Sequence, residues 1–199
     1  MAPILAVRGW PLRGLQMSGT PFRCQIRLGL SDLDRNVYVQ RPIATAQATD
    51  EPDEHILLRF LAWVLFYDEQ LLDGQGFVDL HQPDLLAHDL TGALTLWIEC
   101  GMPPLKRVQK ALGRSKTARF IGLFAHQTEA DAFRKELVNS NARQKSQIEI
   151  YLIPNDFMIW LETHGGRNMQ WTATISEGTL YLDVDGAAAE CQPERVPLG

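Results

Sequence analysis

The segment from residue 83 to 101, PDLLAHDLTGALTLWIECG, constrains the fold more than any other part of the chain. Two runs of strand-forming residues flank a Leu-Thr-Gly turn at residues 90 to 92, and this pattern predicts a tight β-hairpin. Asp84 stands at the start of the first strand and Glu99 near the end of the second. Residues equally distant from the turn pair in an antiparallel hairpin, so Asp84 is expected to face Ile98 or Glu99. The hairpin therefore predicts two neighbouring carboxylates.

Neighbouring carboxylates suit the metal-dependent cleavage of phosphodiesters. Two or three such groups can hold Mg²⁺, which activates a water and neutralises the charge that develops on the phosphate. A third acid, Glu54, lies near the start of the strongest predicted helix, Asp50 to Asp68, on the same face as Leu57 and Leu61. Glu54 is either a partner of the helix dipole or a residue of the site, and both interpretations carry equal weight.

A block of positive charge follows the hairpin. Residues 100 to 128 contain no acid but six cations: Lys106, Arg107, Lys110, Arg114, Lys116 and Arg119. Pro103 and Pro104 are expected to open a short helix that ends near Gly113. This helix would attract a polyanion, so nucleic acid is a candidate partner through Lys106, Arg107, Lys110 and Arg114. A solvated basic helix face is an equally good interpretation of the charge alone.

The order of these elements resembles that of the PD-(D/E)XK nuclease superfamily. Pro83-Asp84, fourteen intervening residues and then Glu99-Cys100-Gly101 are similar to the motif that names the superfamily. The preceding helix with Glu54 and the following helix and strand complete an α-β-β-β-α-β order. Gly101 departs from the motif, because a lysine is expected there. Members of the superfamily often carry this lysine on the following helix, where Lys110 is the first candidate and Lys106 the second.

A second resemblance covers about residues 22 to 186. The stretches SDLDRN, LLRFLAW, LWIECG and TLYLDVDG are similar to the YaeQ family of bacterial proteins, a compact variant of the restriction-endonuclease-like fold without a settled biochemical role. The resemblance implies Glu54, Asp84, Glu99 and Lys110 as the candidate catalytic site, with Mg²⁺ (or Mn²⁺) held by the three acids. It leaves three hypotheses open: a Mg²⁺-dependent nuclease, a catalytically inactive relative that binds nucleic acid or a protein partner, and a purely structural or regulatory domain.

The expected fold class is α+β, with a restriction-endonuclease-like core and an added β-hairpin at each end. The first hairpin joins a strand at residues 22 to 30 to a second from residue 37 to about 48, and the last hairpin spans residues 170 to 184. A short strand is expected at residues 77 to 81. Three further elements are expected around the core: a strand at residues 117 to 125, a helix from Thr128 to about Asn141 and a strand at residues 147 to 153. Another short helix is expected at residues 156 to 164.

Residues 21 to 199 are expected to form one domain. Residues 1 to 20 are interpreted as a disordered leader or an over-extended translation start, since a Gly-Trp-Pro break interrupts their apolar run. The three widely spaced cysteines, Cys24, Cys100 and Cys191, favour a reducing compartment, and we expect a cytoplasmic protein. No apolar run approaches the roughly 18 residues that a membrane span needs. Ligand spacings typical of structural zinc are also absent from the sequence.

Overall fold

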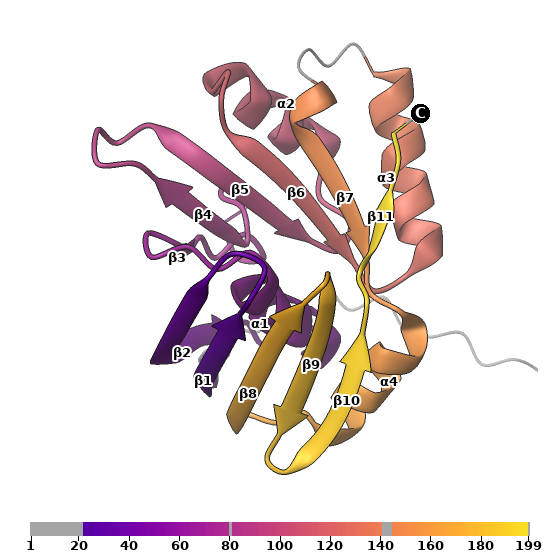
Figure 1. The fold of residues 1–199 in the computed structure, drawn as a ribbon. Helices are drawn as coiled ribbons and strands as arrows, with labels where there is room; N and C mark the ends of the chain where they lie inside the picture. Colours follow the sequence, from indigo (N-terminus) through magenta and orange to yellow (C-terminus); the bar gives the residue numbers. More distant parts are fainter. Residues whose placement is uncertain (1–21, 80, 141–144, 199) are drawn as a thin grey trace, which may run out of the picture.

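The computed structural model describes residues 22–79, 81–140 and 145–198, which form two β-sheets and four α-helices (Figure 1). The leader predicted for residues 1 to 20 lies outside the described residues. Within them, no helix has the length and apolar character that crossing a membrane requires. Cys24, Cys100 and Cys191 are free, in agreement with their spacing, and all three are buried.

The first sheet has five strands in the order β10-β9-β8-β1-β2. Its strands are β1 (Phe22–Asp32), β2 (Val37–Gln47), β8 (Asn168–Ser176), β9 (Thr179–Val184) and β10 (Ala187–Cys191). Both predicted terminal hairpins are confirmed here, β1 with β2 and β8 with β9, while β1 and β8 run parallel. Glu177 and Gly178 turn the second hairpin with φ of 53° and 73°, the positive values that a tight hairpin turn needs.

The second sheet has six strands in the order β11-β7-β6-β5-β4-β3. Its strands are β3 (Leu72–Asp73), β4 (Leu85–His88), β5 (Leu94–Cys100), β6 (Arg119–Phe124), β7 (Ile148–Leu152) and β11 (Glu194–Val196). The predicted hairpin is β4 with β5, and β5, β6 and β7 run parallel to one another. The strand predicted at residues 77 to 81 is wrong: the amide of Val78 bonds to the carbonyl of Gln75 in a turn, and the edge strand lies earlier, at β3.

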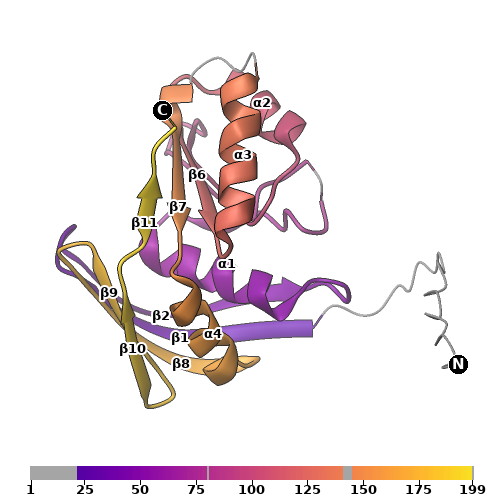
Figure 2. The same ribbon diagram turned by 90° about the vertical axis from the view of Figure 1, so that its right-hand side faces the viewer.

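The helices are α1 (Asp53–Leu65), α2 (Leu105–Arg114), α3 (Gln127–Asn139) and α4 (Asn155–His164). Helix α1 is shorter than the predicted span from Asp50 to Asp68, because Pro52 with its extended backbone stands immediately before it. A short 3₁₀ turn at Lys145–Gln147 precedes β7. Figure 2 shows α1 between the two sheets, with α2 and α3 on the far side of the six-stranded sheet.

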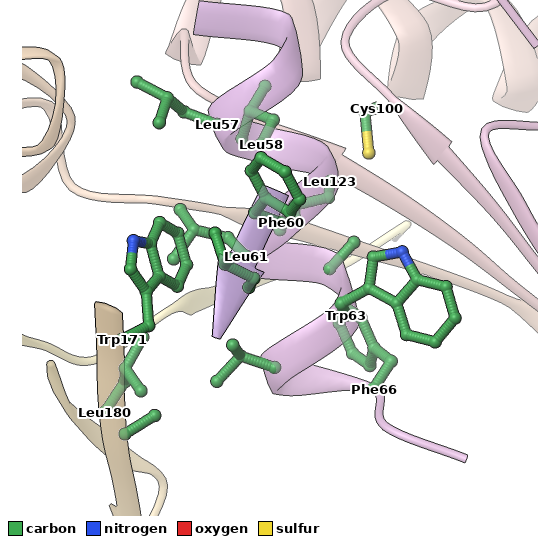
Figure 3. Close-up of a cluster of buried hydrophobic side chains, with 14 of the residues drawn as sticks. Leu57, Leu58, Phe60, Leu61, Trp63, Phe66, Cys100, Leu123, Trp171 and Leu180 are labelled. Atoms are coloured by element: carbon green, nitrogen blue, oxygen red, sulfur yellow. The ribbon is translucent and has the colours of Figure 1, made fainter. Parts of the chain in front are cut away.

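Helix α1 is the centre of the main hydrophobic core, as its nearly uniform apolar sequence predicted. Every residue from Ile56 to Val64 is buried. Phe60 packs edge-on against Trp171 of β8, with ring centroids 5.9 Å apart (Figure 3). A second core fills the space between the other face of the six-stranded sheet and α2 and α3, and Phe124 and Phe133 meet within it. The end of the β4–β5 hairpin therefore lies between two packed cores.

Candidate functional site

The β4–β5 register places Asp84 beside Glu99, as the hairpin predicted. Leu85 pairs with Ile98, and the amide of Asp84 donates to the carbonyl of Ile98 at 3.1 Å. Both carboxylates are buried, with only 1% of Asp84 and 2% of Glu99 exposed. A buried carboxylate is expensive unless it is paired or hydrogen-bonded. The partners of each acid therefore decide what the pair can do.

Glu99 is held by a cation from α2. Arg107 donates from Nε to Glu99 Oε1 at 2.9 Å and from Nη2 to Oε2, which makes a two-point ion pair. The indole of Trp97 donates to Oε1 at 2.8 Å, and Arg107 Nη1 donates to the carbonyl of Gly76 at 2.9 Å. Burial raises the pKa of Glu99 to about 7, with Asp84 adding to the rise and Arg107 opposing it. Both Glu99 oxygens therefore accept hydrogen bonds from side chains of the protein itself.

Asp84 is approached by an imidazole from α1. Asp84 Oδ2 accepts from the amide of Cys100 at 2.8 Å, whereas Oδ1 is buried and has no hydrogen-bond partner within the described part of the chain. His55 Nε2 lies 3.4 Å from that Oδ1 and 3.1 Å from the carbonyl oxygen of Cys100. On its other side, His55 Nδ1 lies 2.6 Å from Glu51 Oε1. The ring is therefore placed between two carboxylates.

His55 is a built-in cation at this position. Burial alone would lower its pKa, but the carboxylates of Asp84 and Glu51 outweigh burial and raise the pKa from 6.5 to about 9. Near neutral pH the imidazolium can donate from both nitrogens, to Glu51 and toward Asp84 and Cys100. The positive charge that Asp84 needs thus comes from the protein itself.

The protonation of His55 predicts how stability changes with pH. A folded-state pKa above the unfolded one stabilises the protein below the unfolded value, and this contribution disappears as the pH rises through the folded value. We expect the free energy of unfolding to fall by roughly 3 kcal/mol between pH 6.5 and about 9. Urea unfolding across this range measures the slope. His55→Gln should flatten it, whereas the exposed His81→Gln should not, and equal slopes in all three proteins would contradict the assignment.

The other two predicted site residues lie apart from the Asp84–Glu99 pair. Glu54 contacts His126, at 3.0 Å between Oε2 and Nε2, although it lines the same hollow as Asp84. Lys110 is exposed on α2 and has no side-chain hydrogen bond or ion pair within the described residues. Its predicted catalytic role stays a prediction, and the cation that meets Glu99 is Arg107.

The hollow beside the pair has a volume of about 520 Å³ and lies between α1, the loop before β4 and the start of α2. Its charged lining residues are Asp50, Glu54, His55, Asp84, Arg107 and Glu129. Acids outnumber cations in this list, which makes the mouth of the hollow unattractive to a bare phosphate backbone.

The carboxylates as arranged do not fit a metal site. Among the described residues, no three or more His, Cys, Asp or Glu side chains are grouped so that they could hold a metal ion. Both oxygens of Glu99 bind Arg107, Glu54 binds His126, and His55 occupies the space in front of Asp84. Binding of Mg²⁺ by Glu54, Asp84 and Glu99 stays a prediction, and it would require these partner side chains to move.

Sequence reasoning missed His55, Glu51 and Arg59, which form one chain of contacts behind Asp84. Glu51 Oε1 accepts from Arg59 Nη1 at 2.9 Å and lies beside His55. A spacing of four residues separates each of the three from the next, and this is the signal that could have found them. Arg59 is also the only charged residue between Ile56 and Tyr67.

Comparison with known proteins places this geometry in a family. The sequence model described as YaeQ protein matches residues 17–193. An uncharacterised YaeQ protein of Escherichia coli strain K12 is 28% identical over 159 residues, which cover 79% of this chain and 86% of the relative. An uncharacterised YaeQ protein of Salmonella typhi is 28% identical over 156 residues, which cover 78% of this chain and 84% of the relative. Crystal structures of YaeQ proteins from Xanthomonas axonopodis pv. citri and Pseudomonas syringae are each 27% identical with a TM-score of 0.78. They match 88% and 89% of this chain over 98% and 96% of their own lengths. The chain belongs to the YaeQ family.

Proposed function

We propose that the protein is a restriction-endonuclease-like member of the PD-(D/E)XK superfamily that binds nucleic acid without cleaving it. The elements from α1 to β6 follow the order helix, three strands, helix, strand, which agrees with the core order of that superfamily. The paired acids lie at the end of the central hairpin, where the superfamily resemblance expects them. These two features support the fold assignment.

The observation that carries the inactive assignment is the ion pair between Glu99 and Arg107. Arg107 is only 8% exposed and Glu99 3% at the side chain, so the pair is shielded from water. A buried two-point pair of this kind is hard to break, because removing one partner leaves an uncompensated charge. Arg107 also binds both oxygens of Glu99, which an active metal site would need as free ligands.

Binding and cleavage assays test this proposal together. We expect labelled DNA or RNA to bind in the presence of EDTA, with an affinity that falls steeply as salt rises, because phosphate neutralisation releases counterions. No cleavage is expected with Mg²⁺ or Mn²⁺. Cleavage that disappears in Glu99→Ala but persists in the exposed control Glu190→Ala would overturn the proposal. So would the absence of binding to any single- or double-stranded DNA or RNA.

One oxygen of Asp84 favours a second candidate, a Mg²⁺-dependent nuclease. Asp84 Oδ1 is buried and accepts no hydrogen bond from the described residues, and it lies 3.4 Å from His55 Nε2, which is also 3.1 Å from the carbonyl oxygen of Cys100. Carboxylate and carbonyl oxygens are ligands that Mg²⁺ prefers. Calorimetric titration with Mn²⁺ separates the candidates: heat of binding that is lost in Asp84→Asn but kept in Glu190→Gln would support the nuclease.

A further inference from the structure

The five-stranded sheet has one face without a covering layer. Side chains of β1 alternate, so that Cys24, Ile26 and Leu28 are buried against the core while Arg23 and Arg27 lie on the opposite face and are exposed. Figure 2 shows α1 and α4 on one side of this sheet, with none of the drawn helices on the other. We call the uncovered side of β1, β2 and β8 the open face.

The open face is positively charged and rich in hydrogen-bonding groups. Outward positions along β1, β2 and β8 include Arg23 and Arg27 and no acid, and the acids of this side, Asp183 and Glu190, are confined to β9 and β10. Amide side chains surround Arg27, with Gln25 beside it in β1, Gln40 in β2 and Gln170 in β8. This charge complements an anionic ligand rather than a basic or apolar protein surface.

A hollow of about 800 Å³ lies on the open face. Gly29 stands in its middle, paired with Gln40 on one side and Thr172 on the other. A Cβ at Gly29 would meet only the carbonyl of Trp171, at 3.9 Å, so the space above the glycine is open. Arg27 and Tyr38 line the hollow on either side of this gap. The open face is therefore concave as well as basic.

One row across the sheet holds two exposed tyrosines, Tyr38 on the open face and Tyr181 beyond it on β9, and ends at Glu190 of β10 beside Tyr181. The strand register aligns Tyr38 with Ser31, Ser31 with Thr174 and Thr174 with Tyr181. Tyr38 is 63% and Tyr181 45% exposed. Three strand spacings separate them, or about 14 Å. Exposed aromatic rings at such a spacing are suited to stacking on unpaired bases.

We propose that the open face binds single-stranded nucleic acid, with phosphates at Arg23 and Arg27 and bases on Tyr38 and on Tyr181 of the adjoining strand β9. That the ligand is a nucleic acid rests on the proposed function. The contact surface differs from the predicted one, which was α2. Arg107 cannot serve as the predicted contact there while it is buried against Glu99, and Arg119 is paired with Glu149 at 2.9 Å. A single strand is specified because a duplex keeps its bases stacked on each other.

Fluorescence anisotropy with labelled oligothymidylate and oligouridylate tests the open face. Tyr38→Ala is expected to weaken binding roughly tenfold, through the loss of one stacked base. Arg27→Gln should reduce the slope of log affinity against log salt by about 0.7, the contribution of one phosphate contact on a single strand. Lys106→Gln with Lys110→Gln on α2 tests the competing surface, and the matched control is Lys135→Gln, an exposed lysine on α3 that should leave both quantities unchanged. Every changed residue is exposed, so we expect all variants to fold. Thermal unfolding of each variant checks this.

Two results would overturn the inference in different ways. Binding that is lost in the α2 variant and kept in both open-face variants would move the contact to α2 and leave the proposed function standing. No binding by the wild-type chain to single-stranded or duplex DNA or RNA would remove the proposed function and the inference together, and it would leave the open face to a protein ligand.

Discussion

Replacing Arg107 by alanine is expected to lower the free energy of unfolding by about 3 to 5 kcal/mol, because Glu99 would stay buried without its cation. The carbonyl of Gly76 would lose a donor in the same change. The loss should be largest above pH 7 and smaller at lower pH, since the pKa of Glu99 is already raised to about 7 and the variant acid can take up a proton instead. Urea unfolding of wild type and variant at one pH above 7 and one pH below 7 measures the difference in the loss.

Two further variants show whether the loss comes from the unpaired carboxylate. Arg107→Lys keeps the charge but cannot form the two-point pair, so we expect an intermediate loss. Combining Arg107→Met with Glu99→Leu removes both charges and should recover most of the stability, because apolar residues can replace a buried ion pair at little cost. A single variant as stable as the double one would show that Glu99 does not depend on Arg107.

The same variant distinguishes the two candidate functions. Arg107→Ala leaves both Glu99 oxygens without their two-point pair, near Asp84, whose Oδ1 accepts no hydrogen bond from the described residues. If the variant gains Mn²⁺ binding that wild type lacks, the arginine is what keeps Asp84 and Glu99 from acting as a metal site. If wild type and variant bind Mn²⁺ alike, the ion pair does not control the site.

The hairpin was predictable because its information is local. An alternating pattern, a tight turn and two acids equally distant from it determine the register, and Leu85 opposite Ile98 follows. By contrast, β10 and β11 carry little strand propensity of their own; Ala187, Ala188 and Ala189 are extended because β9 pairs with them. Such strands depend on a neighbour distant in the sequence, and no local pattern indicates them.

The cation that meets Glu99 comes from the basic helix that the sequence predicts, but the sequence does not single out Arg107. The sequence predicts where α2 begins, but it does not determine how the helix is rotated on the sheet. Val108 and Leu112 turn toward the second core, which leaves Lys106 and Lys110 in solvent and directs Arg107 at Glu99. A rotation by one residue would exchange these roles, and only tertiary packing decides it.

Arg59→Met is expected to lower the free energy of unfolding by about 3 to 5 kcal/mol, because the carboxylates of Glu51 and Asp73 would both lose their arginine. Arg59 is 1% exposed, and it donates to Glu51 Oε1 at 2.9 Å, to Asp73 Oδ1 at 2.6 Å and to the hydroxyl of Thr45. These partners belong to the segment before α1, to β3 and to β2. One side chain therefore ties three separate segments to the central helix.

The loss of Arg59 should also be detectable at the candidate site. Glu51 is shared between Arg59 and His55, so without Arg59 its charge acts more fully on the imidazole and the pKa of His55 should rise further. Titration of His55 by NMR measures this shift, with Arg41→Met as the control for an exposed arginine on β2. A stability loss without a change in the His55 titration would show that Arg59 only stabilises the fold. Both effects together would show that the buried network sets the charge opposite Asp84, and with it whether that carboxylate is free to bind a ligand.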